Sequence, residues 1–130
     1  MKKYYWIFGI ILTIIILVMV LRFPGGEDSW IKDDKGVYIK HGNPSQTPDY
    51  VKAQQEAISC ALNLYSQKKQ EGMQFNSQCL GTCGDYAVDI VHVPKTSEDN
   101  LAENQCQAYM EGKASHFIEL DKEGNICNIV

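Results

Sequence analysis

The first two dozen residues constrain this chain most, because an uncharged and almost wholly apolar run extends from Tyr4 to Leu21. As an α-helix, these 18 residues would rise about 27 Å, close to the ~30 Å hydrocarbon thickness of a bilayer. Lys2 and Lys3 precede the run and Arg22 follows it, as is typical of the two membrane interfaces. The run therefore predicts a transmembrane helix.

A cleaved signal peptide, a buried core helix and a pilin-type leader are the alternatives for this run. It is longer than an ordinary signal-peptide core, and no small-residue cleavage site follows it. It contains no Glu and breaks at Pro24, unlike a pilin leader. We predict an uncleaved, single-pass signal-anchor over 1–23 that contacts the lipid bilayer through Tyr4 to Leu21, a linker over 24–29 and an extracytoplasmic domain over 30–130.

The charge of the remaining chain argues against nucleic-acid binding. All 16 acidic residues lie beyond the apolar run and its flanking Arg22, together with nine Lys, so this part of the chain carries a net charge of −7. Such a balance repels phosphate backbones and anionic head groups. We therefore expect no nucleic-acid partner.

The five cysteines suggest which compartment holds the domain. All of them lie in the hydrophilic part of the chain, at Cys60, Cys79, Cys83, Cys106 and Cys127. This usage favours an oxidising compartment, with a cytoplasmic N-terminus, the main domain outside the cell membrane and disulfide bonds in that domain. A reduced cytosolic domain, in which the thiols are small buried hydrophobes, is the competing interpretation.

Five cysteines allow two disulfides with one thiol left over, and all five are candidates. Cys79 and Cys83 could close on each other, or one of them could bond to Cys60 or Cys106, and the sequence does not choose. The odd thiol would also permit a covalent homodimer.

Hydrophobic periodicity and turn residues predict a small α+β domain. The expected order is β-β-α-β-α-β-β, with two helices packed on one antiparallel sheet. The first half is expected to contain a hairpin of 30–31 with 37–39 and a helix over 48–71, with the Thr47 hydroxyl as its cap and Pro48 at its first position. A loop over 73–84 and a central strand over 85–93 should follow. The last elements are a short helix over 100–111, with Asn100 and Glu103 as its capping pair, and a hairpin of 116–120 with 126–130.

No pattern of catalytic, cofactor-binding or metal-ligating residues stands out. His41, His92 and His116 are scattered, and no second Cys or His pair stands at zinc-ligand spacing. We interpret His92 as a satisfied, partly buried histidine and His116 as a strand-start residue with a polar partner. Neither a nucleophile with its base nor a carboxylate pair in a clear apolar setting is recognisable. We therefore predict a binding protein rather than an enzyme.

One segment carries a resemblance. Trp30 and Ile31, with the run from Gly36 to Ser45, resemble a segment of small uncharacterised archaeal proteins that have an N-terminal membrane anchor. The similarity extends loosely to 104–106 and 116–121. It implies an exported, cysteine-bearing envelope protein, and it implies no catalytic residues.

These observations together favour a binding or accessory module of the cell envelope, with an unidentified protein partner. The apolar residues expected to contact that partner are Trp30, Tyr38 and Phe75, with Tyr109 as an addition. The alternatives are a thiol–disulfide active envelope enzyme that uses Cys79 and Cys83, and a surface or assembly subunit. The spacing of these two cysteines, with three intervening residues instead of two, weakens the enzyme hypothesis.

Overall fold

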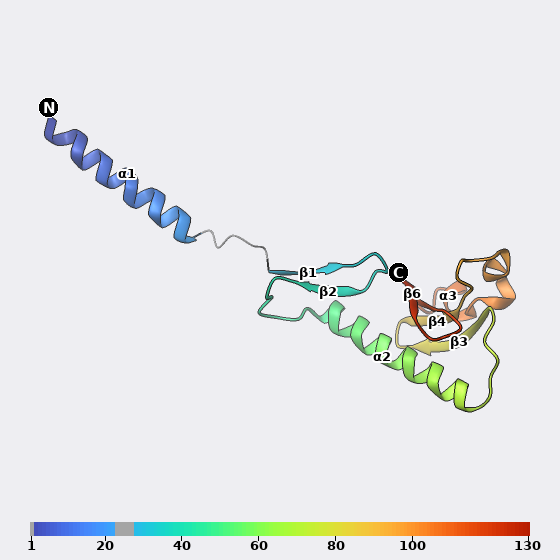
Figure 1. Cartoon of the computed structure of the whole chain (residues 1–130). Helices are drawn as coiled ribbons and strands as arrows, with labels where there is room; N and C mark the ends of the chain where they lie inside the picture. Colours follow the sequence, from blue (N-terminus) through green and yellow to red (C-terminus); the bar gives the residue numbers. More distant parts are fainter. Residues whose placement is uncertain (1, 23–27) are drawn as a thin grey trace.

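A computed structural model describes residues 2–22 and 28–130 of the chain (Figure 1). The first element is the helix α1 (Lys2–Arg22), whose side chains are described from Tyr4 to Met19 and are exposed throughout. Pro24, Gly25 and Gly26, which were expected to end this helix and open the linker, lie outside the described residues.

The predicted transmembrane helix is contradicted. Over the residues that the structure describes, no helix is long and apolar enough to cross a bilayer.

The strands β1 (Ser29–Lys32) and β2 (Tyr38–His41) form the expected first hairpin. Its turn is organised by Asp33, whose Oδ1 accepts hydrogen bonds from the N–H groups of Lys35 and Val37 at 2.9 and 2.8 Å. Gly36 has a φ of +82°, and a Cβ there would collide with the carbonyl oxygen of Ile129. This hairpin is a separate two-stranded sheet, so the prediction of one continuous sheet is wrong.

The long helix α2 (Asp49–Gln70) confirms the prediction of a helix over 48–71. It begins after Pro48 without a side-chain cap, so the predicted Thr47 cap is not formed. Gly72 follows the end of the helix with a φ of +81°, which favours glycine, and the N–H of Met73 bonds to the carbonyl of Lys68 at 3.0 Å. Of its buried residues, Ala57, Ala61 and Tyr65 belong to the core that α2 shares with the main sheet.

The main sheet has four strands in the order β3 (Gln78–Cys83), β4 (Tyr86–Ile90), β5 (His116–Leu120) and β6 (Ile126–Ile129). The predicted central strand and the last hairpin are confirmed by β4 and by β5 with β6. Two predictions are wrong: β3 occupies the segment expected to be a loop, and β4 pairs with β5 in parallel. A parallel pair requires a long crossover, which residues 91–115 supply.

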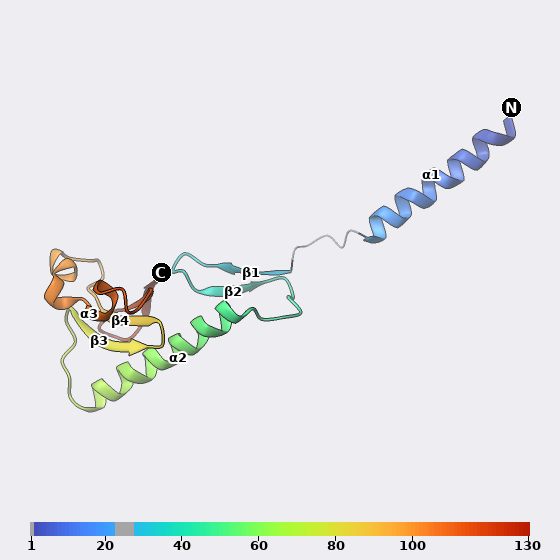
Figure 2. The same ribbon diagram turned by 180° about the vertical axis from the view of Figure 1, so that it is seen from behind.

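The crossover covers the sheet face opposite to α2, and the strands β3 and β4 lie between α2 and α3 in both views (Figures 1 and 2). It contains the 3-10 turns η1 (Ser97–Asn100) and η2 (Ala102–Asn104) and the short helix α3 (Gln107–Met110). The predicted helix over 100–111 is thus wrong, because Leu101 and Gln105 adopt extended backbone angles that break it.

Along β4 and β5, successive side chains point alternately into two hydrophobic cores, one on each face of the main sheet. The face toward α2 buries Val88, Ile90, Ile118 and Leu120. The face toward the crossover buries a smaller cluster formed by Ala87, Cys106 and Ala114, with Phe117 packed against it. Asp89 and Glu119 alternate onto this second face, which places two carboxylates beneath the crossover.

Candidate functional site

One row of residues crosses all four strands of the main sheet. Cys79 of β3 pairs with Asp89 of β4, Asp89 pairs with Glu119 of β5, and Glu119 pairs with Asn128 of β6. Because paired residues on adjacent strands project toward the same face, Asp89 and Glu119 are neighbours under the crossover.

Asp89 is held by the backbone of the crossover. Its Oδ1 accepts a hydrogen bond from the N–H of Cys106 at 3.1 Å. Burial disfavours the ionised carboxylate, and the nearby charge of Glu119 acts in the same direction, so the pKa of Asp89 is raised to about 6. The Cys106 N–H and the Lys95 ammonium oppose this increase.

Glu119 is more deeply buried, with 7% of its surface exposed. Its Oε1 forms an ion pair with the Nζ of Lys95, whose own side chain is half-exposed. Its Oε2 is buried and has no hydrogen-bond partner among the described residues. Buried polar atoms in folded proteins are nearly always hydrogen-bonded, so the unpartnered Oε2 of Glu119 is an exception within this fold.

A cavity of about 190 Å³ opens beside the two carboxylates. We call it the acidic cleft. Its polar lining consists mainly of Asp89, Lys95, Asn100, Asn104, Tyr109 and Glu119. Carboxylates, amides and an aromatic ring therefore converge on one hollow, which is typical of a small ligand-binding site.

His92 and its hydrogen-bond partner Asp99 lie next to the acidic cleft. The Nδ1 of His92 lies 3.0 Å from Asp99 Oδ1, and its Nε2 lies 2.7 Å from Asn76 Oδ1. Although burial opposes the charge of Asp99, hydrogen bonds from the N–H groups of Thr96 and His92 and from side chains lower its pKa to about 2. Both ring nitrogens of His92 are occupied, which confirms its interpretation as a satisfied histidine.

His116 also matches its prediction. It begins β5, stacks on Tyr86 with ring centroids 4.8 Å apart, and its Nδ1 lies 3.2 Å from the carbonyl oxygen of Val130. His41, at the end of β2, is exposed.

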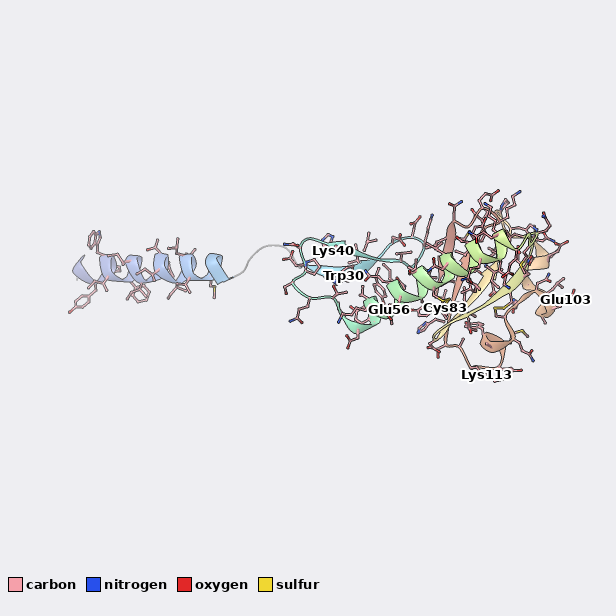
Figure 3. All side chains as sticks on the ribbon, turned by 90° about the horizontal axis from the view of Figure 1, so that it is seen from below. Trp30, Lys40, Glu56, Cys83, Glu103 and Lys113 are labelled. Carbon is pink, nitrogen blue, oxygen red and sulfur yellow. A yellow bond between two sulfur atoms is a disulfide. The ribbon has the colours of Figure 1, made fainter. Side chains whose placement is uncertain are left out.

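The structure contains two disulfides, Cys60–Cys83 and Cys79–Cys106, and Cys127 is a free thiol. Four of the five candidate cysteines are thus bonded, in a pairing that the sequence left open. Cys79 and Cys83 are bonded to different partners. Figure 3 shows Cys83 beside α2, which is the helix that contains its partner Cys60.

Cys79, Asp89 and Cys106 bring their sulfur and carboxylate atoms within 4.8 Å of one another. This is the single group of three such side chains among the described residues. Its sulfur atoms are bonded to each other and so offer no thiolates to a metal ion.

The residues expected to contact a partner do not gather at the cleft. Trp30 donates a hydrogen bond from Nε1 to the carbonyl oxygen of Gln46 at 3.0 Å, and it lies on the hairpin with Lys40, away from Glu103 of the crossover (Figure 3). Tyr38 packs against Tyr50, and Phe75 stacks on Tyr65. Tyr109 alone lines the cleft.

The sequence interpretation missed Asp89 and Glu119, the two residues that define the cleft. Each stands as a single charge inside an otherwise apolar strand, and such an inward-facing charge is a signal of a functional or paired carboxylate. Their adjacency depends on the parallel register of β4 with β5, which the sequence alone did not indicate.

The fold and site define a small α+β domain stabilised by two disulfides, with an acidic cleft under its crossover. No family model, curated protein or solved structure matches the chain.

Proposed function

We propose that the domain is an extracytoplasmic binding module whose acidic cleft takes up a cationic group, an ammonium or guanidinium, of a partner. The observation that carries this proposal is the unpartnered, buried Oε2 of Glu119. A charged donor would supply the missing hydrogen bond and would also compensate the buried negative charge.

Lys95 supports the choice of ligand. Its ammonium already forms an ion pair with Glu119 Oε1, so the chemistry of the cleft accepts this kind of group. The half-exposed Lys95 leaves Oε2 free for a second donor.

The charge of the molecule supports a basic partner. The chain has a net charge of −4, and complementary charge accelerates association and helps to select partners. A basic segment of another envelope protein is therefore the partner that we propose.

Two disulfides support a location outside the cytoplasm. Such bonds persist in oxidising compartments and are rare where thiol systems keep cysteines reduced. We therefore propose that residues 30–130 function on the outer side of the cell membrane.

The test is a titration of the full chain with methylguanidinium and methylammonium, followed by amide chemical shifts. We expect saturable shifts at residues around the cleft, and their loss in Glu119→Gln. Glu56→Gln removes the same charge from an exposed position on α2 and should bind like the wild type.

Neutral acetamide, at the same concentrations, controls for non-specific effects. Equal shifts with acetamide, or unchanged binding in Glu119→Gln, would contradict the proposal. The dispersion of the amide resonances without ligand verifies that each variant is folded.

The thiol–disulfide enzyme that pairs Cys79 with Cys83 has less support, because each of these cysteines is bonded elsewhere.

A further inference from the structure

We propose that the Cys79–Cys106 disulfide is a thiol–disulfide exchange site, in which the carboxyl group of Asp89 transfers the proton. This inference concerns a different chemistry from cation binding and does not depend on it. It rests on the difference in exposure between Cys79 and Cys106 and on the position of the Asp89 carboxyl group.

The two cysteines of this bond differ in access. Cys79 is exposed on β3, whereas Cys106 has 1% of its surface exposed. Because Cys79 is the exposed residue of the pair, we expect an incoming thiolate to attack its sulfur and the sulfur of Cys106 to be the leaving group.

The environment of Cys106 disfavours a bare thiolate. The carbonyl oxygens of Gly81 and Val88 each lie 3.4 Å from its Sγ. These oxygens carry partial negative charge, so they repel a thiolate and would accept a hydrogen bond from a thiol. The departing sulfur is therefore stabilised if it gains a proton as it leaves.

Asp89 is placed to supply that proton. Its carboxylate lies within 4.8 Å of both sulfur atoms, and its Oδ1 is fixed by the N–H of Cys106. Glu119, Lys95, Asp99 and Tyr109 are the other titratable groups that line the same cavity. A pKa raised to about 6 keeps both the acid and the base form of Asp89 populated near neutral pH.

The thiolate of a low-molecular-weight thiol or of a protein cysteine attacks Cys79 Sγ, and the Cys79–Cys106 bond breaks. The electron pair of that bond goes to Cys106 Sγ, which takes the proton from the Asp89 carboxyl group. The products are a mixed disulfide at Cys79, a Cys106 thiol and an Asp89 carboxylate. A second thiol then reduces the mixed disulfide, and in the reverse direction Asp89 accepts the proton again.

The second disulfide is an internal control. Cys60 is exposed and Cys83 is buried, so this bond has the same asymmetry of access. Among the described residues, however, its sulfurs belong to no group comparable to that of Cys79, Asp89 and Cys106. A comparison of the two bonds in one molecule therefore isolates the contribution of the carboxyl group.

The experiment uses the full chain with Cys127→Ser, so that no thiol is free at the start. It is treated with 2-mercaptoethanol between pH 5 and pH 7, alkylated at intervals and mapped by mass spectrometry. Rates are expressed per concentration of thiolate. We expect Cys79–Cys106 to open first, with a rate that falls about tenfold over this range as Asp89 loses its proton.

Asp89→Asn retains an acceptor for the Cys106 N–H but cannot transfer a proton. We expect it to slow the opening about tenfold or more at pH 5 and to remove the pH dependence. Glu56→Gln, beside Cys60 and Cys83, should leave both rates unchanged. Earlier opening of Cys60–Cys83, or the same pH profile for both bonds in the otherwise wild-type chain, would overturn the proposal even if Asp89→Asn fails to fold.

Discussion

The Nε2 of Gln54 donates a hydrogen bond to the carbonyl oxygen of Gly36 at 2.9 Å. The Oε1 of the same side chain accepts a hydrogen bond from the N–H of Tyr38 at 2.8 Å. Gln54 lies on α2 and is 1% exposed, so one buried amide fixes the β1–β2 hairpin to the helix. The hairpin is a separate sheet, and this amide is therefore a main element of its attachment.

Replacement of Gln54 tests this attachment. Gln54→Leu removes both hydrogen bonds and leaves two backbone groups without partners, so we expect the free energy of unfolding to fall by about 2 kcal/mol. Urea denaturation measures the loss. Gln55→Leu, the exposed neighbour on α2, is the matched control, and an equal effect of the two changes would disprove the role of Gln54.

The raised pKa of Asp89 predicts how stability depends on pH. Its ordinary value is 3.8 and its folded value is about 6, so the folded protein binds more protons than the unfolded chain between these values. The contribution of Asp89 to the free energy of unfolding is therefore full below pH 3.8 and is lost as the pH rises through about 6.

Asp89→Asn removes this contribution. We expect the variant to gain stability relative to the wild type as the pH rises from 4 to 7, as measured by urea midpoints. Glu56→Gln controls for the loss of one negative charge. A difference between Asp89→Asn and the wild type that is constant with pH would refute the assignment.

The two disulfides are expected to stabilise the fold to a similar extent. They join residues 23 and 27 positions apart, and loop-closure entropy predicts about 3.5 kcal/mol for either bond. Paired alanine variants, Cys60→Ala with Cys83→Ala and Cys79→Ala with Cys106→Ala, should lower the free energy of unfolding by comparable amounts. A large loss from one pair alone would be inconsistent with this estimate.

Cys127 should be the one thiol that reacts in the native chain under non-reducing conditions. Burial raises its pKa, and the charges of Asp121 and Glu119 add to this effect, so alkylation should be slow at neutral pH and should accelerate above pH 9.0. Mass spectrometry should detect one added label, and none in Cys127→Ser. More than one label would contradict the disulfide pairing.

The same variant tests the covalent homodimer that an odd thiol permits. A dimer formed through Cys127 would disappear on reduction and in Cys127→Ser. Persistence of a disulfide-linked dimer in that variant would assign it to other cysteines.

Several elements followed from the sequence because their signals are local. The helix α2 has apolar residues at helical spacing and a glycine after its last turn, and the hairpin turns contain Asp33 with Gly36 and Asp121 with Gly124. The N–H groups of Glu123 and Asn125 bond to Asp121 Oδ1, as local turn chemistry predicts.

Other elements did not follow, because distant contacts determine them. The strand β3 contains Gly81 and two cysteines, which favour a loop in isolation, and it forms because β4 supplies its hydrogen bonds. The capping pair of Asn100 and Glu103 predicted a helix, yet Asp99 instead accepts a hydrogen bond from the Thr96 N–H at 2.7 Å and starts the turn earlier.

The acidic cleft is also determined by distant contacts and so did not follow from the sequence. Asp89 and Glu119 are thirty positions apart, and they meet only because β4 and β5 are parallel. The resemblance of the 30–45 segment to archaeal anchored proteins stays a prediction, because no comparison bears on it.

Cys106 joins the crossover to the sheet twice, through its bond to Cys79 and through its N–H on Asp89. The crossover also carries Lys95, Asn104 and Tyr109, which form one wall of the acidic cleft. If thiols open the bond, that wall loses its only covalent tether to β3 among the described residues. Uptake of a cation would then vary with the reducing strength of the surroundings. Cys106 would thus couple thiol–disulfide exchange to cation binding.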